Sequence, residues 1–400
     1  MNDKTAATRL LDDSNVMRIF DAFNDREIEA RLVGGCVRDA LIGSKISDID
    51  FAVNAPLEKV IFALQQGRCT VIPTGIAHGT VTAVTNGQAF EITTLRRDIR
   101  TNGRHAKIAS TSNWREDAAR RDFTINALYL DQHGHLFDFF DGGHDLRNGV
   151  VRFIGDPRQR IREDFLRILR YYRFAMRFGK GIDQQSLEAT VEMRYGLILL
   201  SKERKQAELF KILASPSPTE IIKLMNTNKI LYTIFEEDAD LSIWGDIVKM
   251  TNFPHKDPAF AVLIRLFCLF PQDTDFFKNS LRLSNKQLAT LKTWYTVRDL
   301  TLSAESIFRI NSLWGKEAAI VFLLMKCVGR KNPTGIYKKF RRQICERPPL
   351  FPLRGEDIIA RGVCQGKQVG ALWAKCKDWW LDGLGKATKE ECLAFLDKML

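Results

Sequence analysis

The chain has 400 residues, 45% of them hydrophobic, so it can bury a sizeable core and form more than one domain. Its formal net charge of +12 favours a polyanionic partner such as nucleic acid, although a merely well-solvated basic protein would carry the same charge. The absence of an uncharged apolar run of about 18 residues excludes a membrane span. An N-terminus without a signal-peptide core and eight scattered cysteines without CxxC predict a reduced, cytoplasmic protein without structural zinc.

The patterning predicts a change of structural class along the chain. Residues 1–30 have apolar side chains at roughly helical spacing, which predicts a helical leader. Residues 31–155 alternate short β-branched runs, such as DIDFAV and GTVTAV, with glycine turns, so they are predicted to form a mixed domain. Helical patterns follow, interrupted by prolines. We place the helical segments that follow at 156–215, 216–347 and 348–400.

Residues 32–51, LVGGCVRDALIGSKISDIDF, combine features suited to a triphosphate. Gly34 and Gly35 lack a Cβ, so the backbone can turn tightly and approach a ligand closely. The helix predicted to follow them directs free N–H groups and a positive dipole end toward an anion. Arg38 lies in its first turn and adds a planar donor fork. The segment therefore predicts a phosphate site.

Asp48 and Asp50 are predicted to project from one face of a strand, with Ile49 and Phe51 directed toward the core. Two carboxylates this close repel each other unless a cation lies between them, and Mg²⁺ is the hard cation that suits phosphoryl or nucleotidyl transfer. Alone, the glycine pair is more often an ordinary turn and the aspartate pair a polar strand end. Their combination favours a catalytic metal site.

The segment LVGGCVRDALIG followed by DID resembles the first motif of the class II nucleotidyltransferase family, which contains the tRNA CCA-adding enzymes and bacterial poly(A) polymerases. Ser44-Lys45 departs from the family's usual arginine but lies outside the predicted metal ligands. Five further blocks resemble the family in order: EITTLRRD at 91–98, RRDFTINAL at 120–128, DFFDGGHDL at 138–146, EDFLRILRYYRF at 163–174 and SKERKQAELFKIL at 201–213.

The resemblance implies an α+β protein: a polymerase-β-like head with a small mixed sheet at 31–155, then an all-helical neck at 156–215, body at 216–347 and tail at 348–400. Body and tail would bind RNA. The implied reaction is attack by an RNA 3′-hydroxyl on the α-phosphate of CTP or ATP, with Mg²⁺ held by Asp48 and Asp50 as the catalytic residues. Glu91 is equally consistent with a third active-site carboxylate and with a solvated strand face.

The resemblance also implies nucleotide contacts for Arg121 and Asp122, one near the phosphates or base and the other near the ribose. Taken alone, an Arg-Asp pair is more often a local salt bridge or helix cap. The segment 96–114 is rich in glycine, cations and small polar residues, which predicts a mobile loop. In the CCA-adding enzymes a flexible loop at this place is needed to add the final A.

Glu163, Asp164, Arg167, Arg170 and Arg173 recur at a spacing of about three, which predicts one helix face that is first acidic and then basic. Alone, such a stripe is typical of a solvated or RNA-facing surface. The resemblance implies that Asp164 and Arg167 read the Watson–Crick edge of the incoming base. A carboxylate accepts from the amine of C or A, whereas G and U present a carbonyl there. Arg170 and Arg173 would hold phosphates or position Asp164.

Three functions remain open at this point. The first is addition of C, C and A to tRNA, with tRNA, CTP and ATP as partners and no membrane or evident protein partner. The second is poly(A) polymerase, or a partial enzyme that adds only CC or only A, because these relatives share nearly all the catalytic residues. The third is an inactive RNA-binding relative, which retention of both aspartates argues against.

Overall fold

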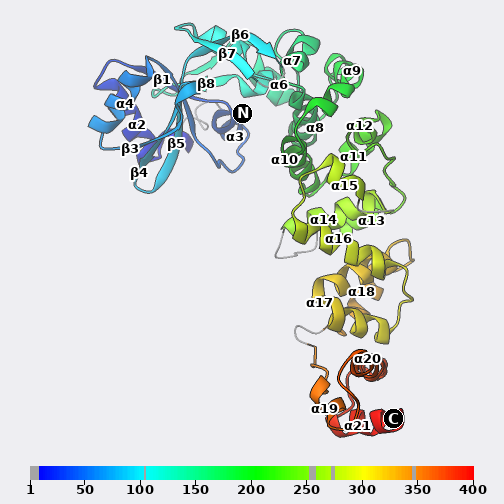
Figure 1. Ribbon diagram of the computed structural model, residues 1–400. Coiled ribbons are helices and arrows are strands. Elements are labelled where there is room, and N and C mark those ends of the chain that lie inside the picture. Colours follow the sequence, from blue (N-terminus) through cyan, green and yellow to red (C-terminus); the bar gives the residue numbers. More distant parts are fainter. Residues whose placement is uncertain (1–8, 103–104, 252–257, 272–274, 345–347) are drawn as a thin grey trace. The chain divides into compact units, whose positions relative to one another are not determined.

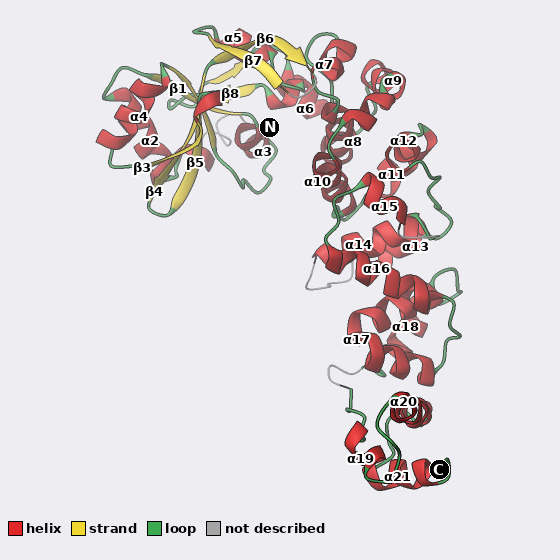
Figure 2. Ribbon diagram, in the orientation of Figure 1, coloured by secondary structure: helices red, strands yellow, loops and turns green. Residues whose placement is uncertain are grey.

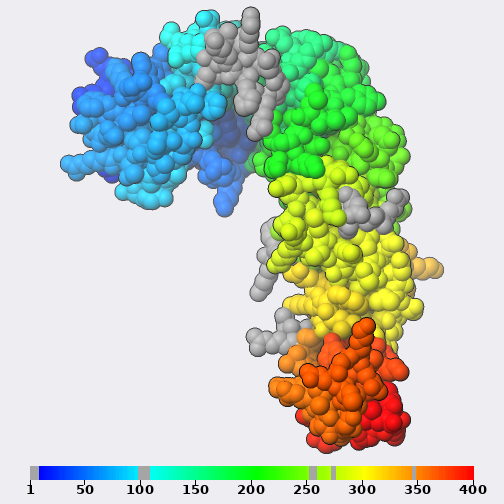
Figure 3. All heavy atoms as spheres, viewed as in Figure 1, coloured from blue at the N-terminus to red at the C-terminus, as the bar shows by residue number. Residues whose placement is uncertain are grey.

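The computed structural model describes residues 9–102, 105–251, 258–271, 275–344 and 348–400 (Figure 1). Figure 3 shows the same view as spheres, with residues outside these ranges in grey. The chain divides into two compact units: Met1–Ile212 with Glu220–Ile234, and Leu213–Thr219 with Phe235–Leu400. Strands occur in the first unit and helices in both, which confirms the predicted α+β class (Figure 2). The exact boundaries at 155, 215 and 347 stay predictions.

The first unit begins with the helix predicted in the leader and then alternates strands and helices. Its elements up to the last strand are α2 (Ser14–Asn24), β1 (Glu29–Val33), α3 (Gly35–Leu41), β2 (Asp50–Asn54), α4 (Leu57–Gln66), β3 (Thr70–Gly75), the 3₁₀ turn η1 (Ile76–His78), β4 (Thr80–Thr85), β5 (Gln88–Thr94), β6 (Arg96–Asn102), β7 (His105–Ser110), α5 (Trp114–Ala119), η2 (Thr124–Asn126), β8 (Leu128–Leu130) and β9 (Leu136–Asp138).

Seven of these strands form a mixed sheet in the order β3-β4-β5-β2-β1-β8-β9. Among the described strand pairs of this sheet, only β2–β5 is parallel, and it sets Asp50 beside Glu91. Helices α2 and α4 cover one face, where Phe20 and Phe23 pack edge-on against Phe51. This burial confirms that Ile49 and Phe51 face the core. The packing of Phe51 against these helices therefore turns Asp50, its neighbour in β2, toward the opposite face of the sheet.

The segment predicted as a loop, 96–114, instead contains two strands. Strands β6 and β7 pair antiparallel, with a register irregularity between Asp98 and Arg100, and α5 begins at Trp114. Residues 103 and 104 lie outside the described part. The loop prediction was wrong about local structure because strand pairing outweighs the low strand preference of the charged residues in β6 and β7.

The neck is helical, but its predicted single helix is two helices. The helical elements that follow β9 in the first unit are α6 (Gly142–Asn148), α7 (Pro157–Glu163), α8 (Leu166–Phe178), α9 (Gln184–Glu192), η3 (Arg194–Leu199), α10 (Lys202–Leu213), α11 (Thr219–Thr227) and α12 (Ile230–Phe235). Asp164 has an extended backbone, with φ −157° and ψ 107°, so Glu163 ends α7 and a new helix, α8, begins at Leu166. The acidic and basic residues therefore belong to different elements.

The second unit is helical throughout its described residues. Its elements are α13 (Trp244–Thr251), α14 (Pro258–Leu269), α15 (Asp275–Ser280), α16 (Asn285–Arg298), α17 (Ala304–Cys327), α18 (Pro333–Arg341), α19 (Gly355–Ile359), α20 (Lys367–Asp382) and α21 (Lys389–Asp397). Phe308 and Trp380 contribute to one apolar cluster that joins α17 to the last helices. Among the described residues, no helix is long and apolar enough to cross a membrane.

Candidate active site

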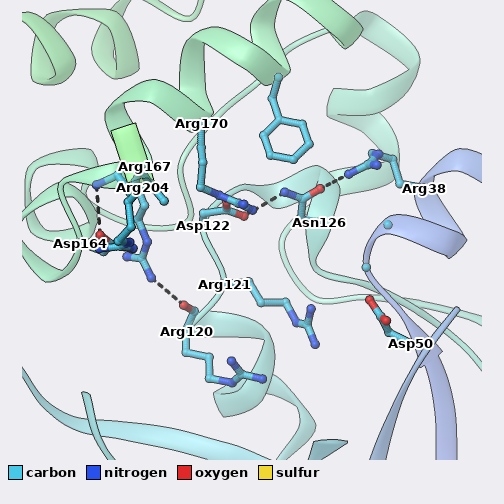
Figure 4. A pocket seen from close by; sticks show the side chains of 14 residues that line it. Arg38, Asp50, Arg120, Arg121, Asp122, Asn126, Asp164, Arg167, Arg170 and Arg204 are labelled. Carbon is cyan, nitrogen blue, oxygen red and sulfur yellow. Dashed lines mark hydrogen bonds and ion pairs between the residues drawn. The ribbon is translucent and has the colours of Figure 1, made fainter. Parts of the chain in front are cut away.

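A cavity of about 510 Å³ lies within the first unit (Figure 4). Six arginines but only three aspartates line it, so its formal charge is strongly positive, as binding of a polyphosphate requires. The lining residues are Gly34, Gly35, Arg38, Asp50, Arg120, Arg121, Asp122, Asn126, Asp164, Leu166, Arg167, Arg170, Phe174 and Arg204.

The glycine pair forms the turn between β1 and α3, as predicted. Gly34 has φ +74°, a conformation that side-chain-bearing residues rarely adopt, and α3 begins at Gly35. A Cβ on Gly34 would lie 3.2 Å from Nη1 of Arg121. The missing side chain thus lets a guanidinium from a distant segment reach the first motif and complete a cationic wall around the cavity.

Asp50 lies at the first residue of β2, directly beside Glu91 of β5. Burial, followed by the charges of Glu91 and Asp48, raises the pKa of Asp50 to about 6. Asp48 is exposed and precedes the strand, so the prediction that both aspartates stand in β2 was wrong for Asp48. The charges of Glu91 and Asp48 nevertheless both act on Asp50, and this excess of negative charge fits a divalent cation.

Although these carboxylates fit a cation in charge and chemistry, they do not form a closed cage. Among the described residues, no group of three or more His, Cys, Asp or Glu side chains is already arranged as a metal site. Mg²⁺ keeps several of its waters and takes only one or two carboxylates together with substrate phosphates. An open pair of aspartates is therefore the arrangement expected of a metal that arrives with a nucleotide.

A hydrogen-bonded chain connects α8 to the first motif across the cavity wall (Figure 4). Arg170 Nε donates to Asp122 Oδ2 at 2.6 Å, and Asn126 Nδ2 donates to the other carboxylate oxygen at 2.9 Å. Asn126 in turn accepts a hydrogen bond from Arg38. Burial alone would raise the pKa of Asp122, but Arg170 and Asn126 outweigh it and the pKa is lowered. Asp122 is therefore an ionised, fixed acceptor.

Arg121 is anchored by two groups behind the cavity. Its Nε donates to the Tyr129 hydroxyl at 3.3 Å, and Nη2 lies 3.4 Å from Asp117 Oδ2. Tyr129 also donates to Asp117 at 2.8 Å. Asp117 is 1% exposed, and although its burial opposes ionisation, the two neighbouring arginines lower its pKa. This support fixes the Arg121 guanidinium in the cavity.

The two residues predicted to read the base are both in the cavity, but they are not paired with each other. Arg167 Nη1 donates to Glu163 at 2.6 Å and to the Arg160 carbonyl, and Nη2 donates to the Arg120 carbonyl. Asp164 Oδ1 accepts from the Leu166 amide at 3.0 Å, and Oδ2 accepts from Arg204 at 2.8 Å. Each side chain is thus oriented by other elements.

The cavity brings together most, but not all, of the predicted site residues. Gly34, Gly35, Arg38, Asp50, Arg121, Asp122, Asp164, Arg167 and Arg170 line it, whereas Asp48, Glu163 and Arg173 do not. Glu163 supports Arg167, and Arg173 pairs with Glu208 at 2.6 Å. Sequence reasoning missed the lining residues Arg120, Asn126 and Arg204. All three lie in the sequence blocks that resemble the family, at 120–128 and 201–213, and this position could have identified them as site residues.

Two family models match the chain. The Poly A polymerase head domain matches residues 30–152, and the model described as the probable RNA and SrmB-binding site of polymerase A matches residues 181–241. These matches cover the sheet and part of the helical segment after α8.

Full-length relatives narrow the assignment. Mitochondrial CCA tRNA nucleotidyltransferase 1 of Mus musculus is 34% identical over 397 residues, covering 94% of this chain and 88% of the relative. The CCA-adding enzyme of Lactobacillus helveticus is 31% identical, covering 90% and 91%. The Bacillus stearothermophilus CCA-adding enzyme in complex with CTP superimposes with a TM-score of 0.75, at 25% identity and 95% coverage of both chains. The resemblance in the motifs is confirmed, and the chain belongs to the CCA-adding nucleotidyltransferase family.

Proposed function

We propose that this enzyme adds C, C and A to the 3′ end of tRNA from CTP and ATP without a nucleic-acid template. The observation that carries the proposal is that one cavity contains both Asp50 and a fixed Asp164–Arg167 edge. Asp50 suits nucleotidyl transfer at the α-phosphate, and the Asp164–Arg167 edge suits selection of a base. The names of the relatives, which specify tRNA and CCA addition, support the same reaction.

The triphosphate is held by the cationic part of the cavity. Arg121 lies next to Gly34 and Arg38 next to Gly35, and both arginines are anchored by hydrogen bonds to other side chains. Anchored guanidinium groups lose little conformational entropy when they bind phosphate, so they favour one orientation of the nucleotide. That orientation presents the α-phosphate toward Asp50.

Base selection uses Asp164 and Arg167. Each Asp164 oxygen accepts one hydrogen bond from the protein and keeps lone-pair capacity to accept from the amine of C or A. Arg167 uses three of its five N–H groups in the contacts described above, so others can donate to ring acceptors of the base. G and U would set a carbonyl oxygen against the Asp164 carboxylate, and this repulsion excludes them.

Arg170 acts on Asp122 rather than on Asp164. Its 2.6 Å ion pair with Asp122 holds that carboxylate where it can accept from ribose hydroxyls. Arg173 is engaged by Glu208, so its role is to support the helix that presents Arg167 and Arg170. Both roles differ from direct phosphate binding, which was one of the two options expected from the motif.

Enzymes of this family generally depend on a metal. We assign Mg²⁺ to Asp48 and Asp50, with Glu91 as a third carboxylate, because burial and these neighbours raise the pKa of Asp50. Bound there, the ion would lower the pKa of the RNA 3′-hydroxyl and neutralise charge on the phosphates. In the absence of such charge, the three carboxylates repel one another.

The test uses a tRNA that ends before CCA, with CTP alone, ATP alone, both together, and GTP with UTP. We expect two C residues with CTP alone, one further A when ATP is added, and no use of GTP or UTP. Asp48→Ala and Asp50→Ala are each expected to abolish addition. If either variant adds nucleotides at the normal rate, the metal assignment is wrong.

Poly(A) polymerase is the second candidate, favoured by the description of the family model that matches residues 30–152. It would add A alone, repeatedly, to unstructured RNA. The same assay separates the two, because that outcome leaves CTP unused. The relatives include mitochondrial enzymes, so a cytoplasmic location rests on the sequence alone and is tested by fractionating cells that express the tagged protein.

A further inference from the structure

The seven-stranded sheet has two contrasting faces on its β3-β4-β5 side. Val81, Ala83 and Ile92 are completely buried on the face covered by α2 and α4 (Figure 2). The alternate residues of the same strands are exposed or half-buried. In an antiparallel sheet, an uncovered face next to an active site is a surface on which a substrate can lie.

The uncovered face carries a row of side chains that starts at the catalytic aspartate. Asp50 of β2 is the register partner of Glu91 in β5, Glu91 is the partner of Thr82 in β4, and Thr82 is the partner of Ile72 in β3. Neighbouring strands are about 4.8 Å apart, so Thr82 lies roughly 10 Å from Asp50 and Ile72 roughly 14 Å. Ile72 is 45% exposed although it is apolar.

Threonine hydroxyls flank this row in two pairs. Thr74 and Thr82 have Oγ1 atoms 2.9 Å apart, and Thr80 and Thr93 have theirs 3.1 Å apart. Each pair uses one hydroxyl proton internally, and the second proton and the unused lone pairs can bond to a ligand. The face thus offers hydroxyl donors and acceptors beside an exposed isoleucine. Because these groups are uncharged, a ligand that binds them can be neutral.

Beyond Asp50, the row runs along strands that do not line the nucleotide cavity. The described residues that line the cavity come from the glycine turn, α3, β2, the segment 120–126, the link between α7 and α8, α8 and α10, and none comes from β3, β4 or β5. In an in-line displacement the attacking oxygen approaches opposite the leaving pyrophosphate. With the nucleotide in the cavity, the acceptor strand must therefore reach Asp50 from another side, and the sheet face offers one.

We propose that the Asp50–Glu91–Thr82–Ile72 row is the site where the 3′ end of the acceptor RNA lies, an inference that rests on the proposed function. The 2′-hydroxyl of the last nucleotide is attached beside the reacting 3′-hydroxyl, so a side chain roughly 10 Å away meets the preceding sugar. Thr82 accordingly hydrogen-bonds the 2′-hydroxyl of the penultimate nucleotide, and Ile72 packs against its base. A 2′-hydroxyl is the group by which proteins distinguish RNA from DNA.

The test combines Thr82→Val with an acceptor tRNA that carries 2′-deoxyribose at the penultimate nucleotide. One neutral hydrogen bond corresponds to about a fivefold change. For the wild type, we expect the deoxy substitution to raise KM for the RNA about fivefold. T82V should raise KM for normal RNA by a similar factor and show no further loss with the deoxy RNA. KM for CTP and kcat should stay within about twofold.

Gln66→Ala is the control, because Gln66 is an exposed polar residue of α4, the helix on the opposite face of the sheet, and its loss should have no effect on KM for RNA. Thermal unfolding of T82V and Q66A excludes misfolding as the cause. Independent evidence comes from 4-thiouridine at the penultimate position, which should crosslink to a peptide containing residues 72–82 even in the Asp50→Ala variant.

The two possible failures give different results. Normal KM values in T82V, a deoxy penalty that persists in T82V, or crosslinks confined to other segments would each overturn the acceptor site while leaving CCA addition intact. Absence of any C or A addition by the wild type would refute the proposed function, and the crosslink would still report whether RNA lies on this face.

Discussion

Arg204 donates a 2.8 Å hydrogen bond to Asp164 from a position 40 residues later in the chain. The two residues lie in different helical segments, because Asp164 precedes α8 and Arg204 is in the first turn of α10. The second Asp164 oxygen is held by the Leu166 amide, so rotation of the carboxylate is restricted at both oxygens. A group that must discriminate an amine from a carbonyl gains selectivity from such a fixed position.

Arg204→Ala is therefore expected to weaken base selection more than catalysis of a single correct addition. Without its partner, the Asp164 carboxylate can rotate, and kcat/KM for CTP and ATP should fall on the order of tenfold, as for loss of one charge-assisted hydrogen bond. Misincorporation of U and G should rise relative to C and A. Competition assays with mixed nucleotides measure both effects.

Lys211→Ala is the matched control for this variant, because it removes one positive charge from the same helix. Lys211 pairs with Glu208 and does not line the cavity. The K211A variant should select C and A over U and G as well as the wild type does. Equal losses of fidelity in both variants would show that the effect of Arg204 is one of general charge and not of Asp164 orientation.

The contrast between local and distant contacts explains which parts of the site the sequence predicts. Gly34, Gly35 and Arg38 are neighbours in one turn, so their joint presence in the cavity follows from local geometry. The pairing of Asp164 with Arg204 depends on how α8 and α10 pack, and no residue spacing reports it. Asn126 was missed for the same reason, because its partner Arg38 is 88 residues away.

The raised pKa of Asp50 predicts how the stability of the metal-free protein depends on pH. Its pKa rises from an ordinary 3.8 in the unfolded chain to about 6 in the folded protein. Between pH 4 and pH 6, the folded protein therefore holds a proton that the unfolded chain has released. Stability consequently decreases as pH rises through this window, and the full penalty, roughly 1–3 kcal/mol, is present above pH 6. Asp50→Asn should therefore be more stable than wild type at pH 7.5 and nearly equal at pH 4. Denaturant unfolding in EDTA measures this difference.

The same carboxylate predicts that the wild type and the Asp50→Asn variant respond to metal to different extents. At pH 7.5, millimolar Mg²⁺ should raise the Tm of the wild type, because a bound cation relieves the repulsion among Asp48, Asp50 and Glu91. D50N should show a much smaller increase. An equal increase in both proteins would place the stabilising ion elsewhere.

The buried Asp122 carboxylate makes Arg170 important for stability as well as for binding. The Asp122 side chain is 9% exposed, and Arg170→Ala would leave it without its ion-pair partner. We expect a loss of about 2–3 kcal/mol, below the usual cost for a fully buried pair because the Arg170 side chain is 32% exposed. Because the pKa of Asp122 is lowered by folding, this difference should diminish as pH falls below 4. Urea unfolding at pH 7.5 and pH 3.5 tests both statements.

Arg162→Ala is the control for R170A, because Arg162 is an exposed residue of the preceding helix and does not line the cavity. Its stability should remain within about 0.5 kcal/mol of the wild type. If R170A were as stable as R162A, the Asp122 pair would not support the fold.

The break between α7 and α8 shows where periodicity misleads. The spacing of Glu163, Arg167 and Arg170 is compatible with one helix, and no proline or glycine interrupts it. The chain departs from helix at Asp164 because tertiary contacts from α10 and η3 hold that residue and its neighbour. The mixed sheet and the helical remainder were predictable, since strand and helix patterns there agree with the packing that each element makes.

Gly196 of η3 supplies the contact that fixes the residue next to Asp164. A Cβ built on Gly196 would lie 1.9 Å from Cδ1 of Phe165, so no side chain fits there unless the ring moves. Gly196→Ala should destabilise the protein by about 1–3 kcal/mol and also impair selection of C and A, because a displaced Phe165 carries Asp164 with it. Gly181→Ala is the matched control, since nothing lies within 4 Å of its Cβ position.

Replacing Phe165 with leucine in the G196A background should recover part of the stability by relieving the clash. If G196A lost stability but retained full discrimination against U and G, the position of Phe165 would not control Asp164, and Arg204 with the Leu166 amide would suffice to orient the carboxylate.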